Sequence, residues 1–184
     1  GLARASYVHF SVHATFSPRR PLDSALLLAG TERLALRDLL DVPLSSGCRV
    51  GVLSGCRTGL VKLRSTPDEV IGLPAGFIRA GFSAVLCALW PVSDLATTLL
   101  VSRLYAFHET HSLAEALRRA QLWLRDARSE ELFESLEEIT TLSGEERTII
   151  TSGLRPGERP FRHPYYWGGL VVVGSSAPAG RARE

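Results

Sequence analysis

The feature that most constrains this chain of 184 residues is a short apolar run that ends abruptly in small residues, a thiol and a glycine. The run Val50–Leu53 is followed by Ser-Gly-Cys-Arg-Thr-Gly, in which Cys56 carries the thiol. This pattern predicts a buried strand over residues 49–54 whose C-terminal turn presents one sulfur at the edge of a sheet. Open α/β sheets place their chemistry at the carboxyl ends of parallel strands. Cys56 is therefore a candidate functional residue.

A second apolar run, residues 7–12, ends in the same way with a histidine, His13. One thiol and one imidazole at two strand ends are the parts of a Cys/His nucleophilic dyad. His9 is four residues earlier, and its apolar neighbours on the strand favour a hydrogen-bonded core histidine. His108 and His111 fall at the end of an expected helix, and we expect them to be solvated.

Strands and helices alternate along the rest of the chain. Further strands are predicted at residues 83–89 and 166–173, and helices at 34–40, 68–80, 94–108, 112–128 and 130–139. Such alternation indicates an α/β protein with a mostly parallel sheet and helices on both faces. Residues 140–163 are polar, with glycine and proline, and are interpreted as a loop or insertion. Residues 175–184 predict a flexible tail.

The cysteines and the charge exclude several classes of function. The three cysteines, Cys48, Cys56 and Cys87, are odd in number and form no CxxC pair, which disfavours a disulfide framework and a zinc site. A reducing, cytoplasmic compartment is therefore expected. Cys48 and Cys87 lie before or within strand runs and are interpreted as structural. A net charge of +2 with scattered arginines predicts no direct contact with nucleic acid, and no apolar run is long enough to predict a membrane span.

Six segments together resemble the successive signatures of the CHAT domain, a caspase-like cysteine peptidase family related to separase. They are Val8–His13, Pro21–Ser24, Val52–Gly59, Asp68–Pro74, Leu89–Asp94 and His163–Trp167, in the family's order. The resemblance implies a caspase-like domain over residues 1–174, in which the N-terminal strands of the caspase sheet are absent or replaced. It also implies attached tetratricopeptide repeats or a regulatory protein as partners, and a protein or peptide as substrate.

The same resemblance implies the roles of the site residues. His13 would be the catalytic histidine, and Cys56 the nucleophile that attacks a peptide carbonyl. The backbone N–H groups of Cys56 and Ala14 would bind the oxyanion. The family usually has glycine where this chain has Ala14, and an acidic residue is common where it has Arg57, whose guanidinium favours a thiolate beside it. No metal or organic cofactor is implied.

Asp94 follows the predicted strand 83–89 across a Trp-Pro turn, so we expect it at the same sheet edge as Cys56 and His13. By resemblance to separase-type peptidases, its carboxylate would line the pocket for the residue before the cleaved bond. That residue would be basic, with arginine favoured because a guanidinium binds a carboxylate with two hydrogen bonds. Asp94 could instead be the N-cap of a helix that begins at Leu95.

Two functions stay open on these grounds. The first is a cysteine endopeptidase, and the second is a catalytically silent scaffold that has kept the fold and the thiol. A serine hydrolase is disfavoured, because the sequence around Ser54 is not G-x-S-x-G and Ser54 would sit inside the strand.

Overall fold

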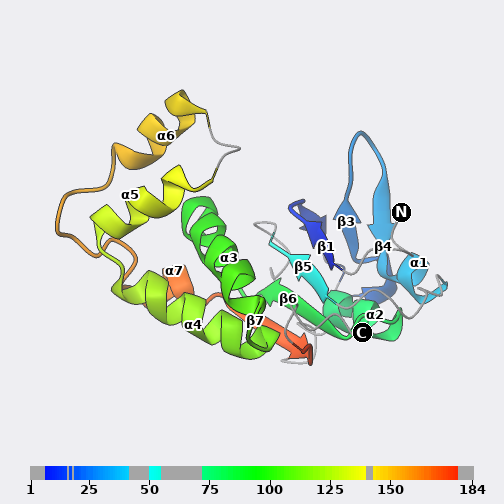
Figure 1. Ribbon diagram of the computed structural model, residues 1–184. Coiled ribbons are helices and arrows are strands. Elements are labelled where there is room, and N and C mark those ends of the chain that lie inside the picture. Colours follow the sequence, from blue (N-terminus) through cyan, green and yellow to red (C-terminus); the bar gives the residue numbers. More distant parts are fainter. Residues whose placement is uncertain are drawn as a thin grey trace.

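A four-stranded sheet forms the centre of the molecule (Figure 1). The computed structural model describes residues 7–15, 17, 19–41, 50–54, 72–139 and 143–177. The sheet has the order β1 (Tyr7–Phe10), β5 (Val50–Leu53), β6 (Ala84–Ala88) and β7 (Leu170–Gly174). β1, β5 and β6 are parallel, and β7 is antiparallel to β6. The expected α/β fold with a mostly parallel sheet is confirmed.

Helices cover both faces of this sheet. On one side lie α3 (Asp94–His108) and α4 (Leu113–Asp126), with α5 (Ser129–Glu137) beyond them. On the other side lie α1 (Leu36–Asp41) and α2 (Gly72–Arg79). The remaining helices are α6 (Gly144–Thr151) and α7 (Pro164–Trp167). No helix among the described residues is both long and apolar enough to cross a membrane.

Alternating side chains of the central strands build two cores. Val52 and Leu86 join the α3-side core, which includes Leu99, Leu104 and Leu124 from the helices. Leu53, Val85 and Cys87 join the α2-side core, which includes Phe77 and Leu39. Every residue of β5 and β6 is buried, because parallel strands covered on both faces have no solvent side. Successive side chains of a strand point to opposite faces, so neighbouring positions enter different cores.

The structural interpretation of Cys87 predicts an unreactive thiol. The side chain is 3% exposed, and burial raises the pKa of the thiol to about 11. At pH 7.5 almost none of it is thiolate, the form that reacts with alkylating agents. We therefore expect iodoacetamide to leave Cys87 unmodified in the folded protein and to modify it after unfolding in guanidinium, as measured by mass spectrometry of the peptide that contains it. Modification of Cys87 in the folded chain at the rate of a free thiol would contradict this expectation. Cys48 lies outside the described residues.

A second, small sheet was not predicted. β2 (Ala14–Thr15), β3 (Ala25–Leu27) and β4 (Arg33–Ala35) form an antiparallel sheet, with the 3-10 turn η2 (Pro21–Asp23) between β2 and β3. The stretch after His13 is therefore a strand followed by a turn rather than only a loop. Strands of two or three residues are too short to show an alternating pattern, so the sequence carries no signal for them.

The C-terminal third differs from the sequence prediction in two places. Residues 144–151, interpreted as loop, form α6; Gly144 and several β-branched residues make this segment a poor helix former, which hides it. The last strand begins at Leu170 rather than 166, because Pro164–Trp167 forms the short helix α7, capped by the His163 side chain. Residues 175–184 were expected to form a flexible tail. Its first residue, Ser175, is bound to the rest of the fold, because its backbone N–H donates a hydrogen bond to the Ser83 carbonyl at 2.9 Å.

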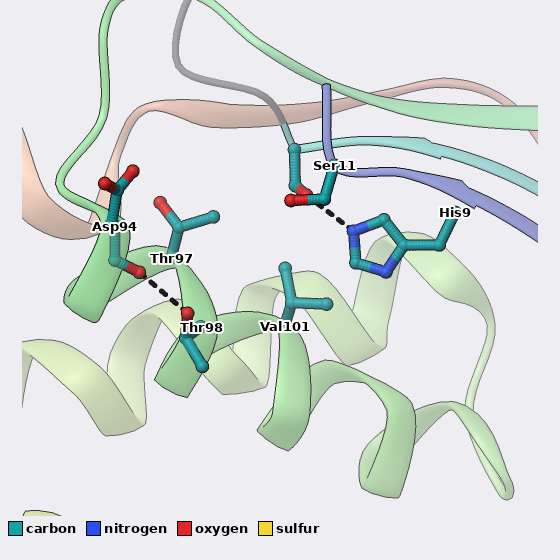
Figure 2. Close-up of a pocket in the computed structure, with 7 residues that line it drawn as sticks. His9, Ser11, Asp94, Thr97, Thr98 and Val101 are labelled. Carbon is teal, nitrogen blue, oxygen red and sulfur yellow. Dashed lines mark hydrogen bonds between the residues drawn. The ribbon is translucent and has the colours of Figure 1, made fainter. Parts of the chain in front are cut away.

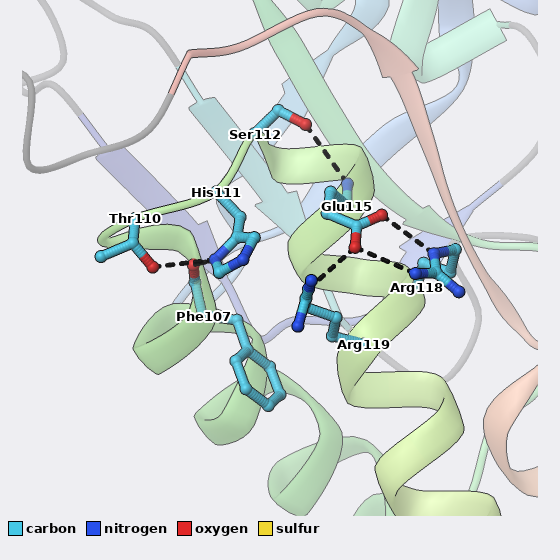
Figure 3. A network of polar contacts seen from close by, with 7 residues as sticks. All are labelled: Phe107, Thr110, His111, Ser112, Glu115, Arg118 and Arg119. Carbon is cyan, nitrogen blue, oxygen red and sulfur yellow. Dashed lines mark hydrogen bonds and ion pairs between the residues drawn. The ribbon is translucent and has the colours of Figure 1, made fainter.

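The start of α4 is held by a network of polar contacts (Figure 3). Ser112 caps α4 by accepting a hydrogen bond from the backbone N–H of Glu115 at 3.4 Å, as the sequence pattern indicates. The Glu115 carboxylate also accepts from Arg118 at 2.9 Å and from Arg119 at 2.8 Å. These hydrogen bonds, that of Arg118 foremost, lower the pKa of Glu115 to about 2. The carboxylate near the N-terminus of α4 also suits the helix dipole.

His108, expected to be solvated, is instead 1% exposed. Its Nδ1–H donates to the carbonyl of His111 at 2.9 Å, and its Nε2 lies 3.2 Å from the Tyr7 hydroxyl. Both ring nitrogens therefore have partners, which is what a buried imidazole requires. The helix end where His108 lies is covered by β1, and this is a tertiary contact that the helical spacing does not reveal.

Candidate active site

Strand β1 presents a polar row to one side and an apolar row to the other. Val8 and Phe10 pack into the α2-side core. On the opposite face, Tyr7 contacts His108 and His9 contacts Tyr105, both on α3. Ser11 continues the polar row, because side chains two apart in a strand share a face. The polar row of β1 therefore runs along α3.

This row leads into a pocket between the ends of β1 and β5 and the first turns of α3 (Figure 2). The pocket has a volume of about 220 Å³. It is lined by one imidazole, four hydroxyls, one carboxylate and one apolar side chain: His9, Ser11, Ser54, Thr97, Thr98, Asp94 and Val101. Ligand pockets for small molecules are usually about 300–1,000 Å³, so this one suits a single side chain.

Ser54 is the point at which β5 enters the pocket. Its backbone N–H donates to the Phe10 carbonyl at 3.2 Å, which extends the pairing of β5 with β1 by one residue. Its hydroxyl lies 2.5 Å from Nε2 of His9. The expected position of Ser54 inside the strand is wrong by one residue, because β5 ends at Leu53. Cys56 comes two residues later in the sequence and lies outside the described residues, as does Arg57.

His9 is the centre of a hydrogen-bonded row of three residues. Besides Ser54, it contacts the Tyr105 hydroxyl through Nδ1, at 3.2 Å. Although the ring is open to the pocket, desolvation by the surrounding protein lowers the pKa of His9 below its usual range. Burial, and then the neighbouring Tyr7, raise the pKa of Tyr105 to about 12. At pH 7.5 a neutral imidazole therefore lies between two protonated hydroxyls, and its one donor and one acceptor nitrogen can serve both.

The interpretation of His9 as a core histidine is half right. The residue is hydrogen-bonded, but it lines the pocket and its side chain is exposed. The signal that could have found it is the two-residue period that His9 shares with Ser11, the residue directly after β1. That period fixes a common face for the two residues, but it does not indicate that this face borders a cavity, because the cavity is made by α3.

Asp94 lines the pocket from α3, and Ser93 rather than Asp94 is the N-cap of this helix. The Ser93 hydroxyl accepts from the backbone N–H of Ala96 at 3.5 Å, and Asp94 is the first helical residue. The alternative role of Asp94 as N-cap is therefore wrong. Figure 2 shows the Asp94 and Thr97 side chains on the pocket side of the first turn of α3. A carboxylate in a first turn also interacts favourably with the helix dipole.

The turn that precedes Asp94 is fixed by the C-terminal segment. The indole N–H of Trp90 donates to the Tyr165 carbonyl at 3.1 Å, so two of the six sequence segments contact each other. Gly169 allows this close approach, since a Cβ there would lie 2.6 Å from Val92 and 3.0 Å from the Trp90 indole nitrogen. These contacts give the two segments a structural role.

His13 lies between β1 and β2, and its side chain is exposed. Its carbonyl accepts the N–H of Leu27 at 2.8 Å, which holds the backbone at this point against β3. His13 is not among the residues that line the described pocket. Ala14 belongs to β2, and no described residue other than glycine has a positive φ, so Ala14 takes its place without the left-handed backbone that glycine would permit. The described residues also contain no group of three His, Cys, Asp or Glu side chains arranged to hold a metal ion.

An α/β domain is the class that the sheet and its two helical layers define. Comparison with known proteins shows its family. The family model of the CHAT domain matches residues 2–175, and the chain belongs to this family. It is also similar to tetratricopeptide repeat protein 28 of Mus musculus, with 30% identity over 142 residues. That alignment covers 77% of this chain and 4% of the mouse protein.

Proposed function

We propose that this domain is a cysteine endopeptidase in which Cys56 is the nucleophile, His13 is the general acid and base, and Asp94 selects a basic residue before the cleaved bond. The observation that carries the proposal is the Asp94 carboxylate in a pocket whose opposite wall is the end of β5. The thiol of Cys56 follows two residues after Ser54, which directly follows β5 and lines this pocket. The proposed nucleophile is thus joined to the specificity pocket by a very short stretch of chain.

The chemistry of the lining supports a cationic side chain as the occupant. A guanidinium offers five N–H donors, and the carboxylate and hydroxyl oxygens around the pocket are acceptors. In the proposed reaction the Cys56 thiolate attacks the peptide carbonyl, and the carbonyl π electrons move to the oxygen. The tetrahedral intermediate then collapses, His13 gives its proton to the leaving amine, and water hydrolyses the thioester. We further propose that tetratricopeptide repeats work with this domain, as the name of the mouse relative suggests.

Replacing Asp94 with asparagine should weaken the preference for basic residues. We expect kcat/KM for peptides with arginine before the cleaved bond to fall about 10- to 100-fold, the value of one hydrogen bond to a charged group. Peptides with a neutral residue at that position should be cleaved as before. Because Ser93 and not Asp94 caps α3, the melting temperature should change little.

Glu109→Gln is the matched control, because it removes an exposed carboxylate at the other end of α3. This variant should cleave arginine and neutral peptides in the wild-type ratio. If Asp94→Asn also kept that ratio, Asp94 would not be the specificity residue.

A peptidyl-arginine acyloxymethyl ketone tests the activity itself. This probe forms a thioether with an active-site cysteine, so mass spectrometry should find it on Cys56 of the wild-type chain and not on Cys87. The label should be lost when the protein is unfolded first. A wild-type chain that neither takes the label nor cleaves a peptide library would favour the scaffold function over the peptidase.

A further inference from the structure

We propose that His9 is a positioning residue: it ties Ser54, at the end of β5, to α3 and thereby sets where the chain beyond Ser54 carries the Cys56 thiol. The effect on cleavage rests on the proposed function, but the tether itself does not. Every contact that forms the tether lies among the described residues.

Ser54 is fixed by hydrogen bonds from both its backbone and its side chain. The backbone N–H bonds the Phe10 carbonyl of β1 at 3.2 Å, and the hydroxyl bonds His9 Nε2 at 2.5 Å. The first bond holds the main chain in register with the sheet. The second holds the side chain beside His9, which lines the same pocket. Together they fix the orientation of the last described residue before the nucleophile.

His9 can act as a tether because its other nitrogen is anchored. Nδ1 lies 3.2 Å from the hydroxyl of Tyr105, and the two rings lie 6.1 Å apart between centroids. Tyr105 is half-buried and packs against the α3-side core. The row Tyr105–His9–Ser54 therefore connects the end of β5 to a helix that the core holds in place.

A second tyrosine–histidine pair allows a comparison with the Tyr105–His9–Ser54 row. Tyr7 and His108 also meet between β1 and α3, with 3.2 Å between the hydroxyl and Nε2. There the second ring nitrogen bonds the carbonyl of His111, so both nitrogens of the His108 ring bond residues outside β5. Only the His9 pair, of these two, opens onto the pocket and contacts the strand that leads to Cys56.

Cleavage should be sensitive to this orientation. Only Gly55 separates Ser54 from Cys56 in the sequence, so the Cα atom of Cys56 lies within about 7 Å of that of Ser54. A shift of Ser54 therefore moves the point from which the chain to Cys56 starts. A displacement of the reacting group of about 1 Å can cost a hundredfold in rate, so the loss of a tether two residues away matters.

Three variants of His9 separate the tether from a general loss of structure. The amide of glutamine reaches the position of the imidazole Nε2 and can bond Ser54, whereas the amide of asparagine reaches only the position of Nδ1. We expect His9→Ala and His9→Asn to lower kcat/KM about 10- to 100-fold, and His9→Gln to restore most of it. Tyr105→Phe should lower it about 2- to 10-fold, the value of one hydrogen bond. Tyr7→Phe, the matched control on the Tyr7–His108 pair, should cleave like the wild type.

The second readout is the rate at which iodoacetamide alkylates Cys56, measured by mass spectrometry, with no substrate present. The alkylation rates of His9→Ala and His9→Asn should differ from that of the wild type. The rate of His9→Gln should stay close to that of the wild type. Equal rates for the glutamine and asparagine variants, or wild-type rates for His9→Ala, would overturn the tether. If the alkylation rates followed the expected order while the wild type cleaved no peptide, the tether would stand and the peptidase function would fail. If cleavage were present and neither readout changed, the tether alone would fail.

Discussion

Replacing Cys56 with alanine is expected to abolish peptide cleavage while the domain stays folded. Removing the nucleophile of a protease lowers kcat by roughly 10⁴-fold or more, because no other group can form the covalent intermediate. The change removes a single sulfur atom, so circular dichroism and the melting temperature should stay close to those of the wild type. Cleavage of an arginine peptide by purified wild-type and variant chains measures the effect.

Cys87→Ala is the control for this result, since it also removes one thiol. It should keep the activity, because Cys87 is buried in β6 on the side of the sheet that faces α2. It is expected to destabilise the fold slightly, since it truncates a core side chain. Wild-type cleavage by the Cys56→Ala chain would end the assignment of the nucleophile.

His13→Ala should give the second-largest loss. General acid and base catalysis contributes about 10²- to 10⁴-fold, so kcat should fall by that amount, more than in any His9 variant. The pH dependence of Cys56 alkylation distinguishes the two histidines. An imidazolium beside the sulfur stabilises the thiolate, so without His13 the rise in alkylation rate should move to higher pH. In His9→Gln the rise should stay where it is in the wild type.

Equal loss of cleavage in His13→Ala and His9→Ala, or loss in His9→Ala alone, would contradict the assignment of His13 as acid and base. It would also direct attention to His9, which already has a hydroxyl on each ring nitrogen. Since the described pocket is lined by His9 and not by His13, this comparison is the decisive one for the mechanism.

The larger elements could be predicted because their signals are local. The helix expected at residues 94–108 has those bounds in the structure, although Ser93 rather than Asp94 caps it. Strands β5 and β6 are continuous apolar runs and were found within one residue of their ends. By contrast, β2 and β3 depend on pairing between short segments, and α6 has almost no apolar stripe. The two strands are therefore determined by tertiary contacts rather than by local pattern.

The site was harder to predict than the fold. The pocket places Asp94 beside the ends of β1 and β5, as expected where a parallel topology brings strand ends together, but of its two expected neighbours Cys56 lies outside the described residues and His13 does not line the pocket. The sequence could not rank His9 as a pocket residue or place His108 in the interior, since both depend on how α3 lies across β1. The same helix supplies Asp94, Thr97 and Val101 to the pocket. The site residues that were missed are those whose role is created by packing between elements distant in sequence.

The N-cap of α3 and the carboxylate of the pocket are two different residues, Ser93 and Asp94, and this has a consequence for how such domains diversify. One residue starts α3 and the next lines the pocket, so a single base change at position 94 can alter the charge of the pocket without removing the helix cap. The stability cost of losing a carboxylate at a helix start is only about 0.3–1 kcal/mol. A gene duplicate can therefore change the charge of this pocket in one step, with the rest of the scaffold unaltered.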